Sequence, residues 1–319
     1  MYSRGEYMSI IKVGSLFAGI GGIDLGFKKA GFKIEWANEI DTKSCTTYKK
    51  NLNHNIICDD IKNINPESLS SIDVLTGGFP CQAFSIAGNK QGFHDERGAI
   101  FFELIRVVRQ INPRVVFLEN VKNLKSHNEG KTLQYIIQTL EQLDYLVTYN
   151  VLNTCEYSDL PQNRERVYIV AFKQQADFMR FQFPQKEVKR KSIRSILENE
   201  VADLFYYENS KIYPLLKEAM NNKETCYQWR RHYVRENKNN LCPTLTANMG
   251  TGGHNVPLIL DDRGIRKLTP RECARLQGFP DSFEFPQYAN SVLYKQLGNS
   301  VSIPVIAKIA KNILLALKQ

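Results

Sequence analysis

The sequence predicts an α/β fold in which a parallel, doubly wound sheet carries a second, smaller module. Three observations support this. Residues 12–172 alternate short runs rich in β-branched residues with segments of helical periodicity, a glycine-rich loop follows the first of these runs, and the pattern becomes irregular, basic and aromatic after about residue 183. Strand–helix alternation is typical of a parallel sheet with both faces covered, and such sheets bind ligands at the carboxyl ends of their strands.

The expected elements follow one another along the chain. The expected strands are 12–17, 33–38, 56–58, 72–76, 114–119, 147–152 and 167–172, and the expected helices between them are 22–30, 42–51, 99–110 and 131–143. In the last of these helices Leu133, Ile136 and Leu140 fall on one face at the 3.6-residue period. Residues 303–317 carry a similar apolar stripe, so we expect a final helix that packs back on the main domain.

Composition narrows the class of protein. The chain has 319 residues, of which 43% are hydrophobic and 24% charged, as in globular proteins of two domains or of one domain with an insertion. Lys and Arg number 42 against 33 Asp and Glu, a net charge of +9. That balance fits a nucleic-acid partner and a merely basic soluble enzyme equally well.

Cysteine usage and hydropathy exclude several other classes. The seven cysteines are an odd number without a C-x-x-C pair, so we expect neither a disulfide framework nor a metal site. The apolar stretch 303–317 is interrupted by Lys308, Lys311 and Asn312, and the N-terminus lacks an apolar signal core. We therefore expect a cytoplasmic protein without a membrane span.

A glycine loop follows the first expected strand. Its sequence is Phe17-Ala18-Gly19-Ile20-Gly21-Gly22. A dinucleotide fingerprint would need a third glycine at position 24, where the chain has Asp24, and this disfavours NAD. Glu39 follows Gly19 by 20 positions at a strand end, which suits a carboxylate that binds ribose hydroxyls. The loop therefore favours a nucleoside cofactor without pyrophosphate, such as S-adenosylmethionine, and a purely structural turn remains the alternative.

A cysteine stands on another loop at the same edge of the sheet. Cys81 lies in the segment 77–85, whose two glycines and proline fix an irregular backbone directly after a strand. Such a position suits a nucleophilic thiolate better than a buried structural cysteine. The next strand ends in Glu119, an acid–base candidate beside that nucleophile.

Eight short motifs then stand in one order along the chain. They are residues 17–22, Asn38-Glu39, Asp60-Ile61, Pro80-Cys81-Gln82, Glu119-Asn120-Val121, residues 162–166, residues 271–275 and Gly298-Asn299-Ser300-Val301. On these motifs the chain resembles the cytosine-C5 DNA methyltransferases along nearly its whole length. Only residues 185–265 lack a clear match, and that region varies within the family.

The resemblance implies a domain organisation and a donor site. We expect a Rossmann-like S-adenosylmethionine-dependent methyltransferase domain of residues 1–184 and 292–319, with an inserted DNA target-recognition domain of residues 185–291. The methyl donor would be S-adenosylmethionine and its product S-adenosylhomocysteine. By resemblance the donor site comprises Phe17, Ala18, Gly19, Gly21, Gly22, Glu39, Ile40, Asp60, Ile61, Pro80, Asn299, Ser300 and Val301.

The resemblance also implies a catalytic group and a DNA surface. Cys81 would add to C6 of a flipped-out cytosine, and Glu119, Arg164 and Arg166 would hold that base. Residues 227–238 are dense in basic and aromatic side chains, although a solvated basic face would look the same. The DNA-binding candidates are Gln82, Ser85, Arg230, Arg231, Arg235, Thr244, Gly252 and Gly253.

The leading interpretation is a bacterial or phage DNA (cytosine-5-)-methyltransferase of a restriction–modification system. We expect a monomer that binds double-stranded DNA, with a cognate restriction endonuclease acting separately. The tRNA-methylating branch of the same fold is the alternative enzyme, and the substantial module at about 185–265 favours DNA. A catalytically inactive DNA-binding homologue is disfavoured by the intact Cys81 and Glu119, and a nicotinamide dehydrogenase by Asp24.

Overall fold

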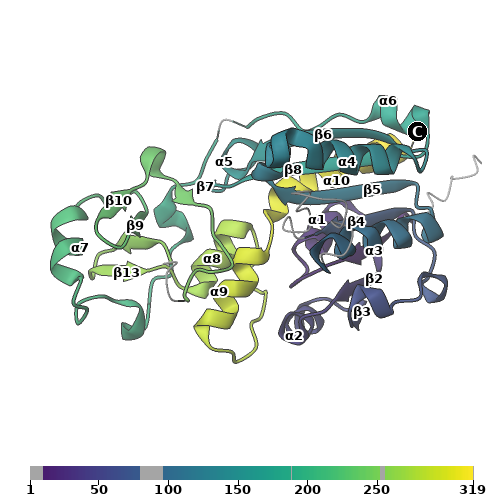
Figure 1. Ribbon diagram of the computed structural model, residues 1–319. Coiled ribbons are helices and arrows are strands. Elements are labelled where there is room, and N and C mark those ends of the chain that lie inside the picture. The colour runs from purple at the N-terminus through teal and green to yellow at the C-terminus, as the bar shows by residue number, and fades with distance from the viewer. Residues whose placement is uncertain (1–9, 80–95, 188, 252–255, 319) are drawn as a thin grey trace, which may run out of the picture.

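The computed structural model describes residues 10–79, 96–187, 189–251 and 256–318, and it shows a larger and a smaller lobe (Figure 1). The larger lobe contains a seven-stranded sheet of order β3-β2-β1-β4-β5-β8-β6. Its strands are β1 (Lys12–Leu16), β2 (Lys33–Glu39), β3 (Asn55–Cys58), β4 (Val74–Gly78), β5 (Val115–Val121), β6 (Leu146–Asn153) and β8 (Glu165–Phe172). The predicted α/β fold with a second, smaller module is confirmed.

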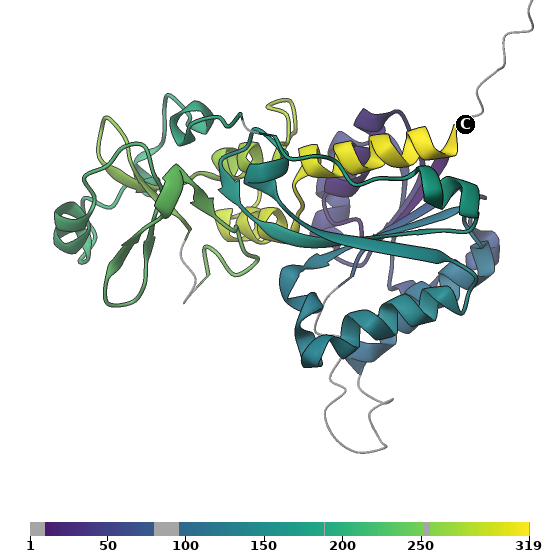
Figure 2. The ribbon, with the colours of Figure 1, turned by 90° about the horizontal axis from the view of Figure 1, so that it is seen from above.

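Helices cover both faces of this sheet (Figure 2). On one face α1 (Gly22–Ala30) and α10 (Ile303–Leu317) pack together, and Phe27 and Ile306 belong to their shared core. On the other face lie α3 (Glu96–Ile111) and α4 (Lys131–Glu141), which bury residues such as Leu104 and Ile136. The helix α2 (Thr42–Asn51) joins β2 to β3. Because both faces are covered, the free edge for a ligand is the one formed by the carboxyl ends of the parallel strands.

The expectation of an all-parallel sheet is wrong for one strand. Strands β1 to β5 pair in parallel, but β8 runs antiparallel to both β5 and β6. Between β6 and β8 lie only α5 (Thr154–Tyr157) and β7 (Gln162–Asn163). A parallel connection needs a crossover of a dozen or more residues, usually a helix. The chain therefore turns back, and β8 inserts between β5 and β6.

Most element bounds agree with the sequence. The helices predicted at 22–30, 42–51 and 303–317 have these bounds in the structure. The helix α3 begins three residues before its prediction, and β4 is displaced by two residues from the predicted 72–76. After β8 comes α6 (Gln175–Arg180), a short helix that the sequence analysis did not include.

The smaller lobe is built on a four-stranded sheet of order β10-β9-β12-β13. Its elements are α7 (Tyr213–Ala219), β9 (Tyr227–Trp229), β10 (Val234–Glu236), β12 (Leu258–Leu260) and β13 (Ile265–Lys267). The helices α8 (Pro270–Gln277) and α9 (Asn290–Asn299) lie between this sheet and the larger lobe (Figure 1). The domain boundaries at 184/185 and 291/292 remain predictions.

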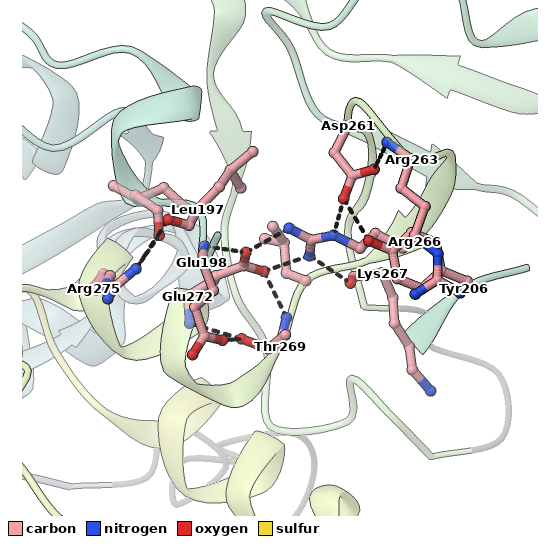
Figure 3. Close-up of polar contacts among 12 residues, drawn as sticks. Leu197, Glu198, Tyr206, Asp261, Arg263, Arg266, Lys267, Thr269, Glu272 and Arg275 are labelled. Carbon is pink, nitrogen blue, oxygen red and sulfur yellow. Dashed lines mark hydrogen bonds and ion pairs between the residues drawn. The ribbon is translucent and has the colours of Figure 1, made fainter. Parts of the chain in front are cut away.

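A buried ion pair organises the base of the smaller lobe (Figure 3). Arg266 on β13 and Glu272 on α8 are both fully buried, and two parallel hydrogen bonds of 2.7 and 2.8 Å join their side chains. Glu272 also accepts a 2.8 Å hydrogen bond from the backbone of Thr269, which completes the capping box of α8. Asp261 pairs with Arg266 from the other side. The motif at 271–275 therefore joins a strand to a helix here.

One segment of the fold is apolar enough to resemble a membrane span. Residues Asn290–Leu317 are long and apolar enough to cross a membrane, but most of their apolar stretch is buried inside the protein. The segment comprises two helices on either side of Ser300, and α10 packs against α1. Core packing therefore accounts for its apolarity.

Candidate active site

A cavity of about 980 Å³ opens at the carboxyl ends of β1, β2, β4 and β5. The strand order reverses between β1 and β4, which is where open α/β sheets bind ligands. The cavity joins the predicted donor-site residues to the predicted base-holding residues in one space. Its walls include Phe17, Ala18, Gly19, Gly22, Glu39, Ile40, Asp60, Ile61, Glu119, Arg164, Arg166, Asn299, Ser300 and Val301.

The glycine loop is shaped by left-handed backbone and held by a carboxylate. Phe17, Gly19 and Gly21 have φ values of 55°, 56° and 90°. The N–H of Gly19 donates a 2.8 Å hydrogen bond to Oε2 of Glu39, and Asp41 N–H donates one of 2.8 Å to Oε1. A Cβ atom built on Gly19 would meet nothing within 4 Å, so the loop presents open backbone. Gly21 does not line the cavity, because its Cα faces Leu52 instead.

Asp24 occupies the position that a dinucleotide fingerprint reserves for glycine. Its side chain is fully buried in α1 and accepts a 2.6 Å hydrogen bond from the hydroxyl of Tyr48 on α2. Burial raises the pKa of Asp24 to about 6, against the hydrogen bonds from Tyr48 and Ser15, which lower it. The residue ties two helices together behind the loop and does not reach the cavity.

The far end of the cavity combines apolar and polar walls. The side chains of Ile40, which is 61% exposed, and Ile61, which is buried, both line this part of the cavity. Asp60 caps a short 3₁₀ turn by accepting a 3.0 Å hydrogen bond from Lys62 N–H. Asn38 has a role that its motif did not predict: its buried amide donates hydrogen bonds to the carbonyls of residues 57 and 59 at 3.0 and 2.8 Å. This amide fixes the loop after β3. The position of Asn38 next to Glu39 in the motif could have indicated that it has a role.

The opposite end of the cavity contains a buried ion pair. Nε of Arg166 lies 3.1 Å from Oε1 of Glu119, and both side chains are almost buried. Burial raises the pKa of Glu119, while the charges of Arg166 and Arg164 act in the opposite direction. Within the described parts of the chain, Oε1 of Glu119 accepts no well-aligned hydrogen bond. A carboxyl group in this state can share a proton with a ligand in the cavity.

The loop with the candidate nucleophile begins at a fixed point. The amide of Asn120 donates a 2.8 Å hydrogen bond to the carbonyl of Phe79, the residue before Pro80, and its oxygen accepts one from Val121 N–H. This role of Asn120 was not anticipated. Six predicted site residues lie outside the described residues, so their roles stay predictions: Pro80, Cys81, Gln82, Ser85, Gly252 and Gly253.

Arg164 makes contacts that its predicted role does not require. The side chain is 2% exposed and donates hydrogen bonds to the backbone carbonyls of Leu245 at 2.8 Å, Gly298 at 3.3 Å and Ser300. Burial, and secondarily the charge of Arg166, lowers the pKa of Arg164 to about 9. Arg164 still lines the cavity, but its guanidinium group is engaged by the protein's own backbone.

The three predicted DNA-reading arginines of the smaller lobe do not line the cavity. Arg230, Arg231 and Arg235 are exposed around the β9–β10 hairpin, and Arg230 donates to the side chain of Gln228 at 3.1 Å. The hydroxyl of Thr244 donates a 2.7 Å hydrogen bond to the carbonyl of Asn163. Among the residues that the structure describes, no three His, Cys, Asp or Glu side chains form a metal-binding group.

Comparison with known proteins agrees with this geometry. The family model for C-5 cytosine-specific DNA methylases matches residues 11–315. The type II methyltransferase M.Bsp6I of Bacillus sp. (strain RFL6) is 50% identical over 310 residues, which cover 95% of this chain and 98% of that protein. The type II methyltransferase M.HhaI of Haemophilus parahaemolyticus is 36% identical over 313 residues, covering 93% and 92% of the two chains.

Solved structures show the same fold at low sequence identity. The S. pombe Dnmt2 methyltransferase superposes with a TM-score of 0.73 at 20% identity, covering 96% of this chain and 98% of that one. A putative DNA modification methyltransferase encoded within an E. coli prophage gives a TM-score of 0.72 at 21% identity, covering 97% and 100%. The chain belongs to the C-5 cytosine-specific DNA methylase family and is a DNA (cytosine-5-)-methyltransferase.

Proposed function

We propose that the protein transfers a methyl group from S-adenosylmethionine to C5 of a flipped-out cytosine in a short specific duplex site, as the methyltransferase of a type II restriction–modification system. The observation that carries this proposal is the single cavity that joins the Gly19–Glu39 loop to the Glu119–Arg166 pair. The protein would act as a monomer in the bacterial cytoplasm at the nucleoid, with a separate endonuclease cleaving unmethylated sites.

The residues around the glycine loop fit a nucleoside donor. Glu39 has free lone pairs for ribose hydroxyls, and the exposed side chain of Ile40 suits the face of an adenine. The buried hydroxyl of Ser300 has no partner in the described part of the chain and is available to the donor. S-adenosylmethionine supplies an electrophilic methyl group, and S-adenosylhomocysteine is left after transfer.

The chemistry on the base would follow from Cys81 and Glu119. C5 of cytosine is a weak nucleophile, and addition of the Cys81 thiolate to C6 forms a C–S bond that makes C5 electron-rich. Glu119 would interact with N3 and the 4-amino group, so that charge on the ring is neutralised as C6 is attacked. After methylation, loss of the C5 proton and breaking of the C–S bond restore the aromatic ring and the thiolate.

The geometry of the base-holding groups requires an extrahelical substrate. Glu119 and Arg166 lie almost buried within the cavity, where a base stacked in a duplex cannot reach them. The target cytosine would therefore leave the stack and enter the cavity. In this arrangement Arg166 would orient Glu119 and contact the O2 edge of the base.

Bisulfite sequencing of DNA from a host expressing the protein tests the substrate and identifies the site. We expect complete methylation of one cytosine in a short sequence, and methylation of tRNA without DNA would overturn the proposal.

The covalent step is tested with a duplex that has 5-fluorocytosine at the target. It should trap the wild type in a denaturation-resistant adduct that needs S-adenosylmethionine, because fluorine cannot leave as a proton does.

Two variants and a control make the trapping experiment specific. Cys81→Ala should form no adduct, whereas Glu119→Gln should bind DNA and donor but turn over about 10²–10⁴-fold more slowly. Cys155→Ala is the matched control, because Cys155 is buried and burial raises the pKa of its thiol. An adduct on any cysteine other than Cys81, or full turnover by Cys81→Ala, would contradict the mechanism.

A further inference from the structure

Residues 162–164 form the junction between the two lobes. The strand β7 pairs in parallel with β11 (Cys242–Pro243), a segment that follows the smaller lobe's β10. Gln162 donates a 2.8 Å hydrogen bond to the carbonyl of Leu276 at the end of α8, and the Asn163 carbonyl accepts the hydroxyl of Thr244. The stretch 242–247 is thus held against the larger lobe.

Arg164 extends this junction to the donor side of the cavity. Its guanidinium binds the carbonyl of Leu245, which belongs to the stretch 242–247. The same group also binds the carbonyls of Gly298 and Ser300, which belong to the segment 298–301. One side chain therefore joins two segments that come from different parts of the sequence and line the same cavity.

The two segments also touch directly. A Cβ atom on Gly298 would lie 2.1 Å from the carbonyl carbon and oxygen of Thr246, so only glycine permits this approach of two backbones. On its other side the segment 298–301 reaches the glycine loop, because a Cβ on Gly22 would lie 2.7 Å from the Ser300 hydroxyl. Thr246, residues 298–301 and the glycine loop are therefore in continuous close contact, so a movement of Thr246 would reach the donor loop.

The electrostatics make Arg164 hard to replace. It is buried, and in the described part of the chain its guanidinium group donates hydrogen bonds to backbone carbonyl oxygens and forms no ion pair with a carboxylate. Carbonyls spread over two segments match the forked donors of a guanidinium, and the single ammonium group of lysine cannot reproduce that pattern. Loss of the Arg164 guanidinium group would leave buried carbonyl oxygens without hydrogen-bond donors.

We propose that Arg164 is a positioning residue that couples binding of DNA at residues 244–247 to closure of the donor site by residues 298–301. When DNA fixes the first segment, Arg164 and the Gly298 contact hold the second segment against the donor. Linkage then requires that the donor strengthen DNA binding by the same factor. The inference rests on the proposed function, because it takes DNA and S-adenosylmethionine as the two ligands.

The test measures this coupling factor with a ligand that does not turn over. Calorimetry gives the Kd of S-adenosylhomocysteine for the full-length protein, with and without a saturating duplex that contains the methylated site. For the wild type we expect the duplex to tighten binding by about 5–150-fold, the usual range of coupling between sites. In Arg164→Lys we expect that ratio to fall close to one.

Arg114→Lys is the matched control. Arg114 is a partly buried arginine that also binds a carbonyl, that of Leu317, but its main partner is Asp177 on α6, and neither residue lines the cavity. The coupling ratio of this variant should equal that of the wild type. A reduced ratio in Arg114→Lys would mean that the loss in Arg164→Lys reflects general destabilisation, and it would overturn the assignment.

A second variant keeps the proposal testable if Arg164→Lys does not fold. Gly298→Ala leaves Arg164 intact but forces the backbones of residues 246 and 298 apart, so the ratio should again fall. A wild-type ratio of one, or variants with the wild-type ratio, would overturn the coupling. These results differ from failure of the proposed function, in which the wild type would neither bind S-adenosylhomocysteine nor methylate cytosine.

Discussion

The backbone N–H of Gly19 donates a 2.8 Å hydrogen bond to Oε2 of Glu39, so the loops after β1 and β2 are fixed to each other. The other oxygen of this carboxylate accepts the N–H of Asp41. Glu39 is therefore held in one orientation before any ligand binds. A preoriented acceptor loses little conformational entropy when it binds a hydroxyl group.

Replacement of Glu39 should weaken donor binding. Glu39→Ala removes charge-assisted hydrogen bonds and releases the Gly19 loop, so we expect S-adenosylhomocysteine to bind about 1–3 kcal/mol more weakly. Calorimetry measures this difference. Glu67→Ala, at an exposed position outside the cavity wall, is the control and should bind as the wild type does. Unchanged affinity in Glu39→Ala would disprove the donor site proposed for this loop.

Replacement of Glu272 should destabilise the protein. Glu272→Ala leaves Arg266 buried without its bidentate partner, and breaking a buried pair in this way costs about 3–5 kcal/mol. Urea denaturation followed by circular dichroism measures the loss. Glu284→Ala removes an exposed ion pair with Lys50 and should change the unfolding free energy little. Equal effects of the two substitutions would show that the buried pair contributes no more than a surface pair.

Asp24 should make stability depend on pH. Its folded-state pKa of about 6 lies above the ordinary value of 3.8, so its stabilising contribution is fully present below pH 3.8 and is lost as pH rises through about 6. Asp24→Asn keeps an acceptor for Tyr48 and does not titrate. Relative to the wild type, the variant should gain about 2 kcal/mol between pH 4 and pH 7. Denaturant titrations across this range test it, and a constant difference would exclude the ionisation of a buried Asp24.

Replacement of an exposed arginine of the smaller lobe should change either the salt dependence or the sequence preference of DNA binding. If Arg235 contacts a phosphate, Arg235→Gln should reduce the slope of log K against log salt concentration by about 0.9. If it reads a base edge, the slope should stay and discrimination among sites should relax. Fluorescence anisotropy at several salt concentrations measures both. Lys311→Gln, on α10, is the control. If Arg235→Gln has the same salt slope and the same discrimination among sites as this control, Arg235 does not contact DNA.

The sequence carried enough local information for most of the larger lobe. The alternation of strands with helices located α1 and α2, and the apolar stripe of residues 303–317 located α10, which buries that stripe in the core. It could not show the direction of β8. That direction depends on how short the connection from β6 is, and the composition of a strand does not record its partner.

The site residues that could be predicted are those whose side-chain type and place at a strand end indicate their role. Glu39 and Glu119 stand at strand ends, and the structure places both in the cavity. Arg164 was harder, because its three acceptors are backbone carbonyls, which leave no trace in the residue types. Asn38 and Asn120 were missed for the same reason, since each amide binds a carbonyl of a neighbouring loop.

The packing of α10 on α1 has a consequence for synthesis of the chain. The helix α1 spans Gly22–Ala30 and α10 spans Ile303–Leu317, so nearly the whole polypeptide separates the two sides of this core. On the ribosome the α1 side of this core emerges long before α10 has been translated, so Phe27 lacks its α10 neighbours during that time. Contacts of such long sequence separation form slowly. We expect the nascent larger lobe to expose an apolar surface to chaperones throughout translation, and to close only after the smaller lobe has been made.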